Sequence, residues 1–151
     1  MPLETQSGEN TFGCYVNEKL IVPKRNGLNP PVLRAYYSQQ NGKPSFNLYA
    51  SMKEKETLHS IAIKTDSFFL AVGTYEISTL NTSRVTGEYR FSEPTTMGTI
   101  YNSTSLNKGE LVIKHYDSGK RIVSGTFWFD AINNNGQKVE VREGRFDVKL
   151  Y

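Results

Sequence analysis

Short segments in which apolar and polar residues alternate run through almost the whole chain, and this alternation limits the fold more than any other feature. Successive side chains of a strand point to opposite faces of its sheet, so a period of two predicts half-buried β-structure. The clearest segments cover residues 12–16, 46–52, 85–91, 110–116 and 121–132. No segment of any length has the i, i+3, i+4, i+7 spacing of an amphipathic helix. We therefore expect an all-β domain in which helix is minor.

Turn-forming residues separate these segments. Groups such as Asn-Gly and Asp-x-Gly supply the positive φ angles that tight hairpins require, and they occur at 41–42, 107–109, 117–119 and 135–136. Further strands are predicted at 19–22, 32–37, 57–64, 99–103 and 137–151, with loops at 23–31 and 81–83. Residues 68–72 and 74–80 are predicted to form a strand pair about Gly73, with a short helix as the alternative for the first of them.

The links between the predicted strands are mostly short enough to be hairpins. Roughly ten strands joined in this way form an antiparallel meander, which tends to close on itself or to split into two packed sheets. We expect a closed barrel like that of the lipocalins (calycins), with a two-sheet β-sandwich as the second choice.

The last predicted hairpin contains a break in its alternation. Val139 and Val141 occupy odd positions, whereas Phe146 and Val148 occupy even ones, so an extra residue must return the strand to the same face. This predicts a β-bulge at Glu143-Gly144, where glycine can adopt a positive φ. On the preceding strand, Phe127 and Phe129 are expected in the core and Trp128 on the opposite face.

The size and charge of the chain exclude several classes of protein. Its 151 residues correspond to one domain, which we place at 11–151, with 1–10 as a polar N-terminal tether. The 18 basic and 15 acidic residues are scattered singly, which argues against nucleic-acid binding. No apolar stretch approaches the length of a membrane helix. A single cysteine, Cys14, excludes an internal disulfide bond, and its alternation with Phe12 and Val16 predicts a buried, unreactive thiol.

Residues suited to catalysis or metal binding do not occur in any recognisable spacing. His59, His115 and Cys14 lie on separate predicted strands, and both histidines share the parity of apolar neighbours that face inwards. The carboxylates that could form an acid/base pair are on strands, where exposed carboxylates are common: Glu88, Glu110, Asp130 and Glu140. We therefore expect no catalytic residue, no metal, no cofactor and no enzymatic activity.

Aromatic residues at outward-facing positions are the best candidates for a binding site. By strand parity Trp128, Tyr116, Tyr49 and Tyr15 point away from the core. Such rings can stack on sugars or anchor a partner protein. The alternative is that they pack against neighbours across the strands.

Two parts of the sequence resemble a known family. They are the opening 10–19 (NTFGCYVNEK), followed by Val22-Pro23-Lys24, and the ending 124–131 (SGTFWFDA), 134–136 (NNG) and 139–148 (VEVREGRFDV). Together they resemble a family of uncharacterised exported lipoproteins from Bacteroidetes-type bacteria, although Glu18 stands where that family usually has glycine. The resemblance implies a periplasmic or outer-membrane (cell-surface) location through a lipid anchor that precedes this segment. Cys14 is a poor attachment site, because no apolar stretch precedes it.

Neither the residues nor the resemblance identifies an activity. We expect an envelope-associated domain that binds a small apolar or saccharide ligand in the interior or mouth of the barrel. The alternative is an accessory module that meets an envelope partner protein through an edge strand or an aromatic face, and a hydrolase is a distant third. A concave apolar pocket of several hundred Å3 would favour a ligand, whereas a filled core with an exposed aromatic patch would favour a partner.

Overall fold

The computed structural model describes residues 1–23, 32–80 and 83–151, and within them the chain consists of strands, turns and loops without a helix. The strands are β1 (Thr11–Val16), β2 (Lys19–Ile21), β3 (Val32–Gln40), β4 (Lys43–Glu54), β5 (Thr57–Thr65), β6 (Gly73–Ile77), β7 (Val85–Ser92), β8 (Thr99–Asn102), β9 (Gly109–Asp117), β10 (Ile122–Ile132) and β11 (Lys138–Lys149). The expected all-β class is confirmed. Most of the loop predicted at 23–31, and residues 81–82 of the loop predicted at 81–83, lie outside the described residues.

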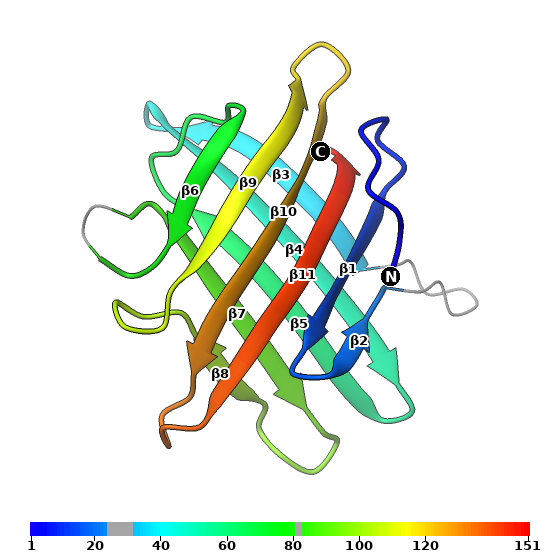
Figure 1. The fold of residues 1–151 in the computed structure, drawn as a ribbon, viewed down its shortest axis with the longest axis vertical. Coiled ribbons are helices and arrows are strands. Elements are labelled where there is room, and N and C mark those ends of the chain that lie inside the picture. The colour runs from blue at the N-terminus through cyan, green and yellow to red at the C-terminus, as the bar shows by residue number, and fades with distance from the viewer. Residues whose placement is uncertain (24–31, 81–82) are drawn as a thin grey trace.

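All the strands belong to one curled sheet. Its order is β2-β1-β11-β10-β9-β6-β7-β5-β4-β3, with β8 paired to both β7 and β10. Hairpins link β3, β4 and β5 in one group and β9, β10 and β11 in another, and Figure 1 shows the two groups crossing, one behind the other. Five strands, β6, β7, β8, β10 and β9, close a ring of paired neighbours. The fold is therefore an all-β barrel with further strands outside the ring.

The pairing differs from a simple meander in two places. The first strand, β1, lies beside the last one, β11. The sixth strand lies between β9 and β7, and β5 pairs directly with β7. The contact between β6 and β7 is parallel and consists of one residue pair, Ile77 opposite Val85. Neither long-range pairing could be inferred from the alternation pattern, which describes each strand separately.

Contacts between distant segments hold the outer strands of the two groups together. The backbone N–H of Tyr151 donates a hydrogen bond to the carbonyl oxygen of Ala35 on β3, with an N···O distance of 2.9 Å. Lys19 of β2 forms an ion pair with Glu54 at the end of β4. These contacts bring the chain end and β2 against β3 and β4, so the sheet wraps around a single core.

The prediction of a strand pair about Gly73 is wrong for the first of the two strands. Residues 68–72 form neither a strand nor a helix but a loop that buries two apolar side chains, Phe68 and Leu70. Phe68 packs edge-on against Tyr75 of β6, with ring centroids 4.6 Å apart, and its N–H bonds to the carbonyl of Pro44. The apolar character of this segment therefore reflects its burial as a loop.

The predicted bulge in β11 is present, but glycine serves a different purpose there. Phe127 lies opposite Gly144 and Phe129 opposite Val141, so two residues of β11 face Trp128 alone. The positive φ, 51°, belongs to Glu143 and not to Gly144. A Cβ atom on Gly144 would lie 2.5 Å from the ring of Phe127, so glycine is needed because the strand passes directly over that ring.

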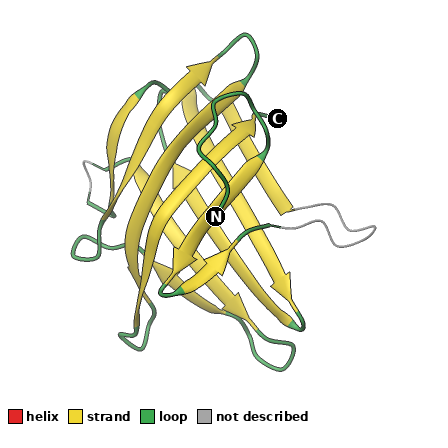
Figure 2. Cartoon of the chain, turned by 45° about the vertical axis from the view of Figure 1, so that its right-hand side comes forward, coloured by secondary structure: helices red, strands yellow, loops and turns green. Residues whose placement is uncertain are grey.

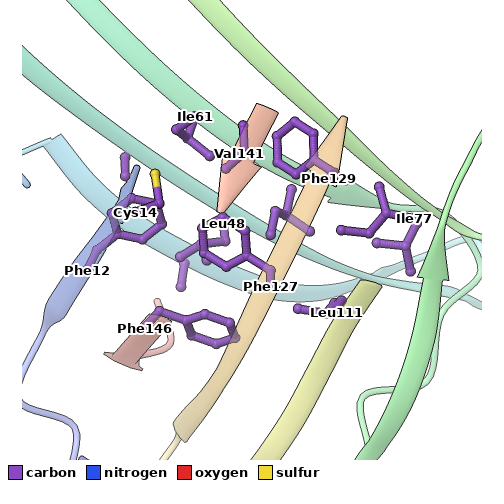
Figure 3. Packing of buried hydrophobic residues seen from close by; sticks show 14 of the residues in the cluster. Phe12, Cys14, Leu48, Ile61, Ile77, Leu111, Phe127, Phe129, Val141 and Phe146 are labelled. Atoms are coloured by element: carbon purple, nitrogen blue, oxygen red, sulfur yellow. The ribbon is translucent and has the colours of Figure 1, made fainter. Parts of the chain in front are cut away.

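The core fills the space between the two groups of strands (Figure 3). Phe127 and Phe129 of β10 project into it and meet buried residues from the strands on the opposite side, including Leu48 and Ile61. The ring of Trp128, between the two phenylalanines, is 41% exposed on the outer face, as predicted. Cys14 is fully buried as expected, and burial raises the pKa of its thiol far above the usual range.

A second bulge, in β9, overturns the orientation predicted for Tyr116. Ser124 lies opposite His115 and Gly125 opposite Ile113, so one extra residue shifts the parity of the strand. Tyr116 consequently packs against the core and meets Tyr37 edge-on, with ring centroids 6.2 Å apart. His115, expected to face inwards, is only half-buried.

Residues 1–10 lie against the outer face of β9, β10 and β11, and Figure 2 shows them running across these strands. Their anchor is the buried carboxylate of Asp147, which accepts hydrogen bonds from the Thr5 hydroxyl (2.6 Å) and from the N–H groups of Ser7 (3.0 Å), Gly8 (2.8 Å) and Glu9 (3.2 Å). Burial alone would raise the pKa of Asp147, but these hydrogen bonds outweigh it and lower the pKa below its usual value.

Candidate functional site

The four aromatic residues predicted to face outwards do not form one site. Tyr49 lies on the outer face of β4, between the buried residues Leu48 and Ala50. Trp128 and Tyr15 lie on the outer faces of β10 and β1, in the other group of strands. Tyr116 faces the core. Only Tyr49 borders the largest outer-face hollow that is bounded entirely by described strands.

This hollow lies on the outer face of β3, β4, β5 and β7 and has a volume of about 510 Å3; we call it the outer groove. Its lining combines two tyrosines, four charged residues, small side chains and three larger apolar residues: Val32, Arg34, Tyr36, Tyr49, Ser51, Leu58, Ser60, Ile61, Ala62, Lys64, Glu88 and Arg90. A hollow of similar size, about 520 Å3, lies beside Phe69 and Ser83. Loop residues form part of its wall, whereas the outer groove is lined by strands and contains Tyr49, one of the residues predicted for a binding site.

The register of four strands builds the groove row by row. Arg34, Tyr49, Ala62 and Glu88 stand opposite one another across β3, β4, β5 and β7. Since opposed residues on one face have Cβ atoms roughly 5 Å apart, their side chains form one continuous surface. Ala62 is buried although it lies on the outer face. The larger side chains beside it therefore rise as walls around a shallow floor.

The neighbouring row supplies hydroxyl groups to the floor. Ser51 and Ser60 are opposed on β4 and β5, and their Oγ atoms are 2.9 Å apart, within hydrogen-bond distance. Val32 and Arg90 occupy the two ends of this row. A hydroxyl both donates and accepts, so each serine retains capacity for a ligand.

Tyrosine rings form the wall on the β3 side. Tyr36 meets Tyr49 edge-on at a centroid distance of 6.5 Å and contacts Tyr151 at 5.6 Å. The prediction named Tyr49 but missed Tyr36. The signal was present, because Tyr36 shares the parity of Arg34 and is adjacent to Ala35, which is buried.

Charged side chains complete the groove. Glu88 forms an ion pair with Lys64 at 2.6 Å and a longer one with Arg90 at 3.6 Å. Among the described residues, no carboxylate lies within ion-pair distance of Arg34. Three positive charges thus face one negative charge, and the groove carries a net positive charge.

The outer face around Trp128 is already occupied by protein groups. The guanidinium of Arg142 stacks over the Trp128 ring, 5.3 Å from its centroid, and donates a 2.6 Å hydrogen bond to Asp130. Arg142 is also opposed to Tyr15 across β11 and β1. A hollow of about 330 Å3 remains on the far side of Trp128, towards Glu110. Here the aromatic rings pack mainly across the strands, which was the alternative considered for them.

The histidines and carboxylates considered for metal binding or catalysis are spread over several parts of the described structure. His59 is buried, and its Nδ1 is 2.9 Å from the Tyr89 hydroxyl; burial lowers its pKa. In the described part of the chain, no three or more His, Cys, Asp or Glu side chains gather as a metal site would require. Asp130 and Glu140 share Arg142 and Lys138 as ion-pair partners on the outer surface.

Comparison with known proteins places the chain in a family. Residues 35–148 match a family model described as "Domain of unknown function (DUF6252)"; the match includes β4, β5, β7 and most of β3, and it begins one residue after Arg34. No curated protein sequence and no solved structure matches the chain. No helix that could cross a membrane occurs in the residues that the structure describes.

Proposed function

The chain belongs to the DUF6252 family of domains of unknown function, and we propose that it is a non-enzymatic module that binds a saccharide in the outer groove. The observation that carries this proposal is the arrangement around Ala62. A tyrosine ring, a serine hydroxyl pair and four charged side chains line the hollow around Ala62.

The chemistry of a sugar ring matches this lining. One face of a pyranose presents C–H groups, which pack favourably on an aromatic ring such as that of Tyr49. Its edge carries hydroxyl groups, which need both donors and acceptors. Ser51 and Ser60 supply both, Glu88 accepts, and Arg34 and Arg90 donate. A groove of about 510 Å3 is within the usual size of small-ligand sites.

The two other binding hypotheses fit the structure less well. An apolar ligand inside the barrel would have to displace packed side chains, since aromatic residues such as Phe46 and Phe129 fill the interior. A partner protein would need a larger, less charged surface, because the core of a protein interface is depleted of charged residues. The outer groove contains four of them.

We also propose that the domain is exported and envelope-associated, as a lipoprotein. The support for this is the resemblance of residues 10–19 and 124–148 to exported lipoproteins. A surface-held saccharide suits such a location. Fractionation of cells that carry the full-length gene, together with radiolabelled lipid incorporation, tests the proposal. Recovery of the protein in the soluble cytoplasm without lipid would refute it.

Titration calorimetry of the purified domain against a panel of neutral and acidic oligosaccharides tests the binding function. Tyr49→Ala should weaken binding about tenfold, because an aromatic stack contributes roughly 1 kcal/mol in addition to the area that it buries. Ala62→Leu should abolish binding by filling the floor. Trp128→Ala is the matched control, since it removes an exposed ring outside the groove. The absence of saccharide binding, or equal effects of Tyr49→Ala and Trp128→Ala, would refute the proposal.

A further inference from the structure

We infer that the saccharide bound by the outer groove is an acidic oligosaccharide, whose carboxylate, sulfate or phosphate groups are held by Arg34 and Arg90. This inference rests on the proposed saccharide-binding function and adds the chemical class of the ligand. Its basis is the distribution of charge along the groove, together with the position of the two arginines relative to the tyrosine wall.

The ion pairs within the groove leave its two ends positive. Lys64 is the closer partner of Glu88, at 2.6 Å, so this pair is internally neutral. Arg90 reaches the same carboxylate only at 3.6 Å, and its side chain is 49% exposed. Arg34 is exposed and has no acidic partner among the described residues. An anionic ligand would supply a negative partner for Arg34 and a second one for Arg90, whose carboxylate partner is shared with Lys64.

The two arginines stand on opposite sides of the small-residue floor. Arg34 is on β3 and Arg90 is on β7, with β4 and β5 between them. Neighbouring strands are about 4.8 Å apart, so the two backbones are separated by roughly 15 Å. This distance is longer than one sugar ring and suits an oligosaccharide that lies across the strands. Ser51, Ser60 and Ala62 line the path between the arginines.

Arginine is well suited to this contact. Its planar guanidinium donates two parallel hydrogen bonds to a carboxylate or a sulfate, and it is weakly hydrated compared with the ammonium group of lysine. The same groups could bind the phosphates of a single-stranded nucleic acid. Such a strand is tracked by a continuous basic groove with successive stacking rings, whereas the outer groove has one cation at each end. The acidic saccharide is therefore the better fit.

The test compares an acidic oligosaccharide with its methyl ester, which has the same sugar rings but no negative charge. Binding of tetragalacturonate and of its fully methyl-esterified form is measured by calorimetry at 20 mM and 200 mM NaCl, with a chondroitin sulfate tetrasaccharide as the sulfated probe. An exposed ion pair contributes roughly two- to fivefold in affinity, so the acidic form should bind about tenfold more tightly at low salt. The advantage should shrink at high salt, because the charges are exposed.

Single substitutions then assign the effect to its residues. Arg34→Gln and Arg90→Gln should each reduce the preference for the acid two- to fivefold and leave the affinity for the neutral ester unchanged. Lys120→Gln is the control, since it removes one positive charge from the exposed β9–β10 turn, outside the groove. Circular dichroism and thermal unfolding of each variant establish that it is folded.

The outcomes separate this inference from the proposed function. Equal affinity for the acidic and the neutral tetrasaccharide, with binding still lost in Tyr49→Ala, refutes the acidic class and leaves saccharide binding standing. An equal loss of affinity for the acidic and the neutral ligand in Arg34→Gln and Arg90→Gln also refutes the acidic class. Binding of neither ligand class refutes both proposals. Tighter binding of an oligothymidylate than of either saccharide would show that the groove serves nucleic acid instead.

Discussion

Replacing Asp147 by asparagine should detach residues 5–9 from the barrel and destabilise the domain by about 2 to 3 kcal/mol. The carboxylate accepts four hydrogen bonds from this segment, between 2.6 and 3.2 Å in length. A hydrogen bond to a charged group contributes roughly 1 kcal/mol more than a neutral one, and the amide of asparagine turns a donor towards N–H groups. Since its remaining oxygen can still accept some of the bonds, the full sum of about 4 kcal/mol is not expected.

Urea unfolding at several pH values provides the assay. Folding lowers the pKa of Asp147, so its ionised form stabilises the folded state above the unfolded-state pKa of about 3.9. This contribution is lost as the pH falls through the lower pKa of the folded state. The difference between wild type and Asp147→Asn should therefore be largest near neutral pH and should narrow below pH 4.

Two controls keep the interpretation specific. Thr5→Val removes one of the four donors and should cost about 1 kcal/mol. Glu9→Gln changes a carboxylate that contacts only the exposed Ser7 hydroxyl, and it should have little effect. A loss below 0.5 kcal/mol in Asp147→Asn, or a loss of the same size at pH 7 and pH 2, would show that the carboxylate does not hold this segment.

Three further predictions concern the core. Phe127→Ala should cost about 3 to 5 kcal/mol in urea unfolding, and Trp128→Ala clearly less; equal losses would mean that both faces of β10 are buried. Gly144→Ala should cost about 1 to 3 kcal/mol because its Cβ would clash with the Phe127 ring, whereas Gly119→Ala should be nearly neutral, since its Cβ would make only an ordinary van der Waals contact with Asp117. Cys14 should react slowly with a thiol reagent in the native protein, and rapid labelling before unfolding would contradict its burial.

The alternation of apolar and polar residues predicted the strands well because it indicates which side chains of a strand face the core. It located the β11 bulge from the parity of Val141 and Phe146, since large apolar residues leave little doubt about their orientation. It failed at the β9 bulge, because His115 and Tyr116 are both amphipathic and either could face inwards. It also gave no warning of Asp147, whose burial depends on a segment more than 130 residues away in sequence.

The candidate site was only partly predictable for a related reason. Tyr49 could be recognised from the alternation in its own strand, but to recognise the outer groove one must know the register of four strands. Arg34 and Arg90 are far apart in sequence and look like ordinary exposed charges. Arg90 reaches the end of the row that contains Ser51 only because β5 pairs directly with β7, although β6 lies between these two strands in the sequence.

The pairing of β1 with β11 has a consequence for how the chain acquires its structure. During synthesis the first strand emerges well before its partner, so it stays without this partner until the residues of β11, Lys138–Lys149, have been made. Contacts between such distant segments slow folding, because a long loop must close before they can form. The nascent chain should therefore stay incompletely folded until β11 has been synthesised.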